Sequence, residues 1–75
     1  MSELRDGILI YDELIQRFDI RFGLEEYYGG LHCGECFEVK ADQDWIPVRI
    51  EMNLERKWYI VGLPNVELPG LRVRI

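Results

Sequence analysis

Apolar and polar residues alternate one by one along much of this chain, and this period of two constrains the fold more than any other feature. The clearest run is 45–52, where Ile46, Val48, Ile50 and Met52 alternate with Trp45, Pro47, Arg49 and Glu51. Residues 17–22 alternate in the same way, with Phe18, Ile20 and Phe22 on one face. Because successive side chains of a strand point to opposite faces, both runs predict half-buried strands.

The remaining segments extend this pattern to five or six short strands. They lie at 8–11, 17–22, 31–41 with an interruption near Gly34, 45–52, 58–61 and 71–75. Residues 12–16 connect the first two as a hairpin, or else form a single helical turn. Short strands separated by turns every eight to twelve residues predict a mainly β fold. We expect a small antiparallel β-barrel or a strongly bent sheet, with an SH3-like barrel as the best fit.

Length and composition favour one small domain over residues 1–75. A chain of 75 residues supports a single core, and 48% apolar residues are too many for a disordered chain. The first residues lack the basic flank and apolar run of a signal peptide, and no apolar run approaches the length of a membrane helix. We therefore expect a cytoplasmic protein without a membrane segment, with its two cysteines as free thiols.

The segment 32–36, with sequence HCGEC, is the most conspicuous candidate for chemistry. Two thiols at this spacing can bind zinc or cycle through a disulfide. A structural zinc site needs four ligands, however, and no second Cys/His pair occurs in the chain. The redox interpretation needs a helix after the first thiol, whereas a strand is predicted here. Structural thiols are therefore favoured over a metal or redox site, and no cofactor is expected.

No catalytic constellation is recognisable, so we expect no enzyme. His32 is the only histidine, and the only serine that could serve it as a nucleophile is Ser2. Adjacent carboxylates such as Glu25 and Glu26 point to opposite faces of a strand, so they do not converge on one substrate atom. Gly29-Gly30 precedes a strand rather than a helix, which removes the usual phosphate-binding geometry.

The net charge of −5 opposes sequence-independent binding to nucleic acid. It permits the opposite hypothesis, an acidic inhibitor that imitates nucleic acid and blocks a DNA- or RNA-handling enzyme. A third hypothesis is nucleic-acid binding through a stripe of surface arginines, drawn from residues 17, 21, 49, 72 and 74. The leading hypothesis is a non-catalytic protein-interaction module, whose partner is another protein or, as a weak homo-oligomer, a second copy.

The hairpin 45–63 offers a surface for such an interaction. If residues 53–56 reverse the chain, Met52 lies opposite Lys57 and Ile50 lies opposite Tyr59. The outer face then collects Trp45, Arg49, Trp58 and Ile60, a set too apolar for a surface that meets only water. Trp and Arg also dominate interface hot spots. The alternative is that the N-terminal hairpin covers this face, with Phe18 and Phe22 packing on Trp58.

The order of residues resembles that of a family of short bacterial proteins. The likeness lies in the segments LHCGECFEV (31–39), WIPVRIE (45–51), WYIVGL (58–63) and GLRVRI (70–75), together with the hairpin 7–20. That family is a domain of unknown function, often carried on mobile genetic elements. The resemblance implies a bacterial cytoplasmic protein, and it implies no activity and no site residues.

Overall fold

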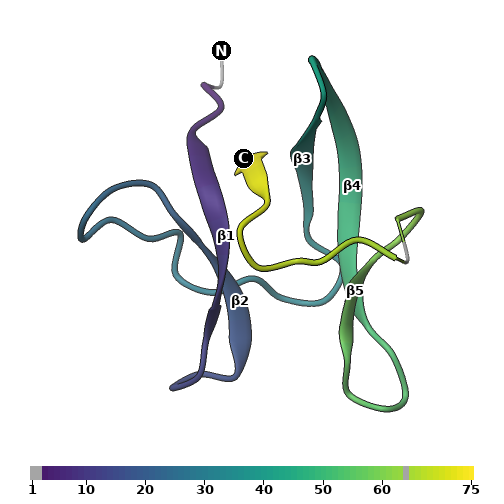
Figure 1. Cartoon of the computed structure of the whole chain (residues 1–75). Helices are drawn as coiled ribbons and strands as arrows, with labels where there is room; N and C mark the ends of the chain where they lie inside the picture. Colours follow the sequence, from purple (N-terminus) through teal and green to yellow (C-terminus); the bar gives the residue numbers. More distant parts are fainter. Residues whose placement is uncertain (1–2, 64) are drawn as a thin grey trace.

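Six antiparallel strands form a single sheet in the computed structural model, which describes residues 3–63 and 65–75 (Figure 1). The strands are β1 (Asp6–Asp12), β2 (Arg17–Arg21), β3 (Cys36–Ala41), β4 (Asp44–Met52), β5 (Trp58–Ile60) and β6 (Arg72–Arg74). The described residues contain no helix, so 12–16 is the connection of a hairpin. The predicted mainly β architecture is confirmed. Ser2 lies outside the described residues.

The strand order is β2-β1-β6-β3-β4-β5, which places the C-terminal strand in the middle of the sheet. Figure 1 shows this yellow strand between the purple and blue β1–β2 hairpin and the teal and green β3–β4–β5 segment. β2 and β5 are the two edges of the sheet, so the sheet is not closed into a barrel. The predicted closed barrel is therefore not formed, and the SH3-like arrangement stays a prediction.

The sheet bends strongly enough to bring its two edges together through side chains. The rings of Phe18 on β2 and Trp58 on β5 meet edge to face, with centroids 6.5 Å apart. The Phe18–Trp58 contact of the alternative is therefore present, but it lies at the core and does not cover the outer face. Phe22 packs elsewhere: the Arg5 guanidinium carbon lies over the Phe22 ring, 4.0 Å from the ring centroid.

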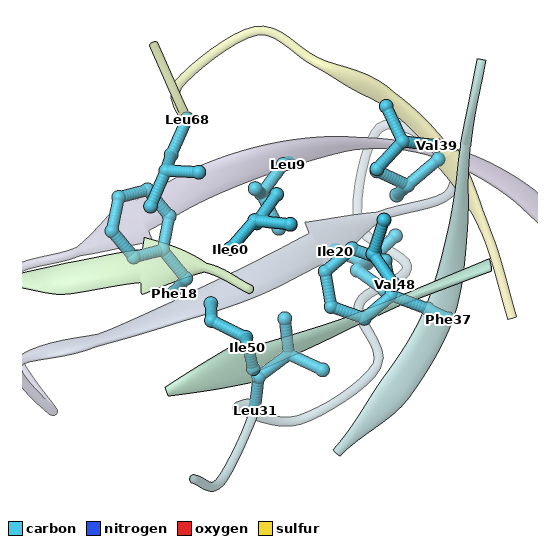
Figure 2. Packing of buried hydrophobic residues seen from close by; sticks show 11 residues of the cluster. Leu9, Phe18, Ile20, Leu31, Phe37, Val39, Val48, Ile50, Ile60 and Leu68 are labelled. Carbon is cyan, nitrogen blue, oxygen red and sulfur yellow. The ribbon is translucent and has the colours of Figure 1, made fainter. Parts of the chain in front are cut away.

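One core fills the inside of the bend, and Figure 2 shows its side chains converging from both halves of the sheet. Its members are Leu9, Phe18, Ile20, Leu31, Phe37, Val39, Val48, Ile50, Ile60, Leu68 and Val73. Nearly all of them come from alternate strand positions, as a period of two requires. Because the core takes one face of each strand, the other face of the sheet points away from the core.

The turn between β4 and β5 differs from the expected one by a single residue. Asn53 closes a loop that runs to Lys57: its Oδ1 accepts hydrogen bonds from the amides of Glu55 (2.9 Å) and Lys57 (3.0 Å). Met52 therefore lies opposite Trp58 rather than Lys57, and Ile50 lies opposite Ile60 rather than Tyr59. A shift of one residue moves every side chain of a strand to the other face, so β5 is inverted relative to the prediction.

Two parts of the sheet's edges are unsuited to pairing with another chain. Residues 27–31 run along β2, where Tyr28 and Leu31 donate backbone hydrogen bonds to Ile20 and Phe18, both at 2.8 Å. β5 pairs only with residues 50–52 of β4, so the first half of β4 has one neighbouring strand, and Pro47 lies in that half. A proline offers no N–H to an incoming strand.

In the described residues, no helix is long and apolar enough to cross a membrane.

Candidate functional site

Trp45 lies on the outer face of the sheet, where cationic side chains from neighbouring strands gather around its ring. The Arg74 guanidinium lies 4.4 Å from the ring centroid, the Lys40 ammonium 5.2 Å and the Arg72 guanidinium 5.8 Å. Cations within about 6 Å of an indole ring are attracted by its negative face. We call Lys40, Trp45, Arg49, Arg72 and Arg74 the Trp45 face.

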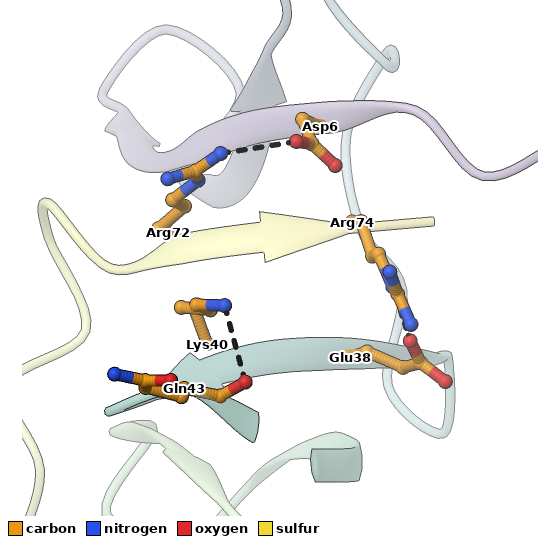
Figure 3. A network of polar contacts seen from close by, with 6 residues as sticks. All are labelled: Asp6, Glu38, Lys40, Gln43, Arg72 and Arg74. Atoms are coloured by element: carbon orange, nitrogen blue, oxygen red, sulfur yellow. Dashed lines mark hydrogen bonds and ion pairs between the residues drawn. The ribbon is translucent and has the colours of Figure 1, made fainter. Parts of the chain in front are cut away.

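Two carboxylates and a backbone carbonyl oxygen hold these cations in place. Arg72 pairs with Asp6 at 3.2 Å, Arg74 pairs with Glu38, and Lys40 donates to the Gln43 backbone oxygen at 3.3 Å (Figure 3). The central strand β6 is thus joined to β1 and to β3 by ion pairs of its outer side chains as well as by backbone hydrogen bonds.

The Trp45 face differs in charge from the rest of the molecule. Arg49 pairs with Glu51 at 3.1 Å, which makes Glu51 the third carboxylate beside the four cations of the face. The resulting balance is close to neutral and slightly positive, whereas the whole chain carries −5. The acidic excess of the protein therefore lies elsewhere.

The structure separates the four residues that the sequence placed on one surface. Trp45 and Arg49 share the outer face of β4, and Arg49 is exposed. Ile60 is fully buried in the core, and Trp58 is half-buried against Phe18. The inverted register of β5 is the cause, because it turns both residues inward. Ile60 is thus enclosed in the core, and Trp58 leaves only part of its surface exposed.

The outer face of β1 carries a groove that sequence patterns did not indicate. A hollow of about 480 Å³ is lined by Ile8 and Ile10 on β1 and by residues 21–24. A second hollow of about 660 Å³ shares Ile10 and continues along 11–13 to Ile15, Asp19, Tyr27 and Gly29. We call the two together the β1 groove. Ile8 is 42% exposed and lies directly opposite Arg72, so the groove adjoins the Trp45 face.

Asp19 forms part of the groove and is only 3% exposed. Its Oδ1 accepts three backbone hydrogen bonds, from Ile20 at 2.8 Å and from Gly29 and Gly30 at 2.9 Å. Both glycines have positive φ, 114° and 101°, which points their consecutive N–H groups at one oxygen. This carboxylate fastens the 27–31 segment to β2.

The second oxygen of Asp19 has a different environment. No described residue donates a hydrogen bond to Oδ2. In the described chain, however, every fully enclosed side-chain oxygen or nitrogen has a partner. Oδ2 is therefore not fully enclosed, and Asp19 is one of the residues that line the groove.

A second clamp closes the same loop near its end. Glu35 accepts hydrogen bonds from the Tyr28 hydroxyl at 2.5 Å and from the His32 backbone amide at 2.9 Å. The hydrogen bond to Glu35, together with partial burial and the negative charge of that carboxylate, raises the pKa of Tyr28 above its ordinary value.

The two cysteines lie in and just after the segment that leads into β3. Cys33 and Cys36 are both free and exposed. Across residues 3–63 and 65–75, no three His, Cys, Asp or Glu side chains lie together in a way that could hold a metal ion. The only histidine, His32, is exposed, and its backbone is engaged by Glu35.

The chain is similar to known proteins in both sequence and fold. A family model described as "Domain of unknown function (DUF5348)" matches residues 7–75. A solved crystal structure of a protein from Ruminococcus gnavus, a structural-genomics target, is similar to the chain with 59% sequence identity and a TM-score of 0.87. The match covers 95% of this chain and 100% of that one. No curated protein matches. These similarities bring no activity, ligand or partner to the site.

Proposed function

We propose that this chain, which belongs to the DUF5348 family of domains of unknown function, is a non-catalytic protein-interaction module that binds through the outer face of its sheet. The observation that carries the proposal is the adjacency of two features on that face. The cation-ringed Trp45 lies on one side of β6, and the partly apolar β1 groove lies on the other.

Both features are of a kind that partner proteins use. Tryptophan and arginine supply much of the binding energy at protein interfaces, and apolar residues in a hollow provide the buried centre. Leu24 is 85% exposed at the end of the groove, and Ile8 is exposed beside it. Exposed apolar side chains that border one hollow are a typical feature of interaction sites.

The alternatives have less support from this surface. On the Trp45 face, Arg49, Arg72 and Arg74 are each paired with a carboxylate, which leaves little free positive charge for phosphates. The same pairing removes three carboxylates from any acidic surface that would imitate nucleic acid. The SH3-like arrangement, the cytoplasmic location and the lack of catalysis all remain parts of the proposal.

Affinity capture with a panel of surface variants tests the proposal. Trp45→Ala and Leu24→Ser each change the outer face, and Leu54→Ser is the control, because Leu54 is fully exposed in the β4–β5 loop. We expect one protein from the native host to be captured by the unchanged chain and by the control, and to be lost or strongly reduced with both face variants. Equal capture by all four forms would contradict the proposal.

A further inference from the structure

We infer that the β1 groove binds a lysine or arginine side chain of the partner, with a large apolar side chain of the same segment seated beside it. This inference rests on the proposed function, since it names the chemistry of the partner. Three carboxylates line the second hollow of the groove, and exposed apolar residues line the first.

The position of Asp19 provides the first argument for a cation. Burying a carboxylate is costly unless partners compensate its charge. Here Oδ1 is engaged by three amides, while Oδ2 has no donor among the described residues and is not fully enclosed, in a residue that lines the groove. An N–H donor of positive charge is the group that complements this oxygen best.

Two further acids at the rim strengthen the negative potential. Asp12 and Glu13 line the same hollow at the end of β1. Glu13 is exposed, and Asp12 uses Oδ1 to accept the amide of Leu14 at 3.0 Å. Three carboxylates that face one hollow attract a cation more strongly than any one of them does alone.

The other lining residues favour an organic cation over a metal ion. Tyr27 is 49% exposed and lines the hollow with Ile10, Ile15 and Tyr11, although the Tyr11 ring packs edge to face against Phe18. Aromatic rings attract ammonium and guanidinium groups, and apolar walls cover the methylene stem that carries them. A metal ion would gain nothing from these walls.

The neighbouring hollow determines what lies next to the cation. Ile8, Phe22 and Leu24 line it, and it joins the acidic hollow at Ile10. Arg21 also lines it, but its guanidinium is occupied by the backbone oxygens of Gly23 at 2.8 Å and Leu24 at 3.4 Å. An apolar side chain fits this end, so the bound segment carries a basic and an apolar residue close together.

Small probes test the cation site by NMR titration of the folded chain. Butylguanidinium represents an arginine side chain, and butylurea is its neutral analogue. We expect butylguanidinium to shift the Gly29 and Gly30 amide resonances saturably, because both amides bind Asp19. Butylurea should bind at least about threefold more weakly, as loss of even modest ion pairs predicts. Equal shifts with both probes, or none with either, would overturn the inference.

Charge variants locate the site without disturbing the Asp19 hydrogen bonds. Asp12→Asn with Glu13→Gln removes two rim charges, and asparagine can still accept the Leu14 amide. Asp42→Asn with Glu55→Gln is the matched control, because it changes the net charge equally at two exposed turn positions. Butylguanidinium affinity should fall about threefold or more in the rim variant and stay unchanged in the control. An equal fall in both would show general charge attraction and refute the site.

The outcomes separate this inference from the proposed function. If the probes show no preference for the cation while Leu24→Ser still abolishes capture of a partner, the inference fails and the interaction module stands. If the cation binds as expected but the face variants capture the same proteins as the unchanged chain, the cation site stands and the proposed function fails.

Discussion

Replacing Asp19 with alanine should remove a large part of the stability of this domain. The change deletes one oxygen that accepts three backbone hydrogen bonds. Two of the donors, the amides of Ile20 and Gly30, belong to buried residues, and the third belongs to the exposed Gly29. After the substitution the two buried amides have no acceptor, whereas the Gly29 amide can bind water.

The magnitude follows from these three donors. A buried N–H without a partner costs about 1–3 kcal/mol, and a net hydrogen bond to a charged group contributes about 1.5–3 kcal/mol. Partial solvation of the Gly29 amide lowers the sum, so we expect Asp19→Ala to reduce the free energy of unfolding by about 3–5 kcal/mol. A domain of 75 residues has a stability on the order of 5–10 kcal/mol, so the variant should lose between about a third and all of it.

Urea unfolding followed by tryptophan fluorescence measures this change. Asp19→Asn is the matched control, because its side-chain oxygen can still accept the same amides, and we expect a loss of only about 1–2 kcal/mol. Hydrogen exchange at Gly29 and Gly30 should accelerate in the alanine variant before global unfolding. A loss below about 1 kcal/mol for Asp19→Ala would refute the idea that this carboxylate fastens the loop.

Three further predictions concern single side chains. Ile60→Thr should lower the free energy of unfolding by about 2–4 kcal/mol, because Ile60 is fully buried. Arg49→Ala should change it by less than about 0.5 kcal/mol, because Arg49 is exposed. Urea unfolding measures both changes. Gly30→Ala should lower the free energy of unfolding by about 1–2 kcal/mol more than Gly34→Ala. Both glycines have positive φ, but only at Gly30 would an added Cβ meet Ile15, at 3.0 Å. Equal losses of stability in the two variants would exclude that contact as a cause. The pKa of Tyr28 should fall in Glu35→Gln when followed by NMR. Because the folded-state pKa of Tyr28 is raised, the Tyr28–Glu35 hydrogen bond contributes its full stabilisation below the unfolded-state pKa near 10. That stabilisation is lost as the pH rises through the folded-state pKa.

The strands could be predicted from sequence because each has one buried face. In β4, Val48 and Ile50 point into the core, so alternation identified both the strand and its inward side. The faces of β5 could not be assigned in the same way. With three residues, β5 is too short to show a period, and its register depends on the side chain of Asn53, whose two hydrogen bonds lengthen the turn by one residue.

The groove was missed for a related physical reason. Alternation placed Asp19 on the outward face of β2, and that assignment is correct. Segment 27–31 buries Asp19, because the amides of Gly29 and Gly30 bind its carboxylate. This segment forms neither a strand nor a helix. A lone acid between apolar strand residues, followed ten residues later by two glycines, is the only trace of this contact in the sequence.

Site-specific photo-crosslinking in the native host tests most directly whether the outer face binds a partner. A photoreactive amino acid replaces Ile8, which lines the β1 groove opposite Arg72, and in a second variant it replaces Leu54 in the β4–β5 loop. Both positions are exposed, so both variants should fold. The account predicts one defined crosslinked protein from position 8 and none of that mass from position 54. The same products from both positions, or none from position 8, would contradict it.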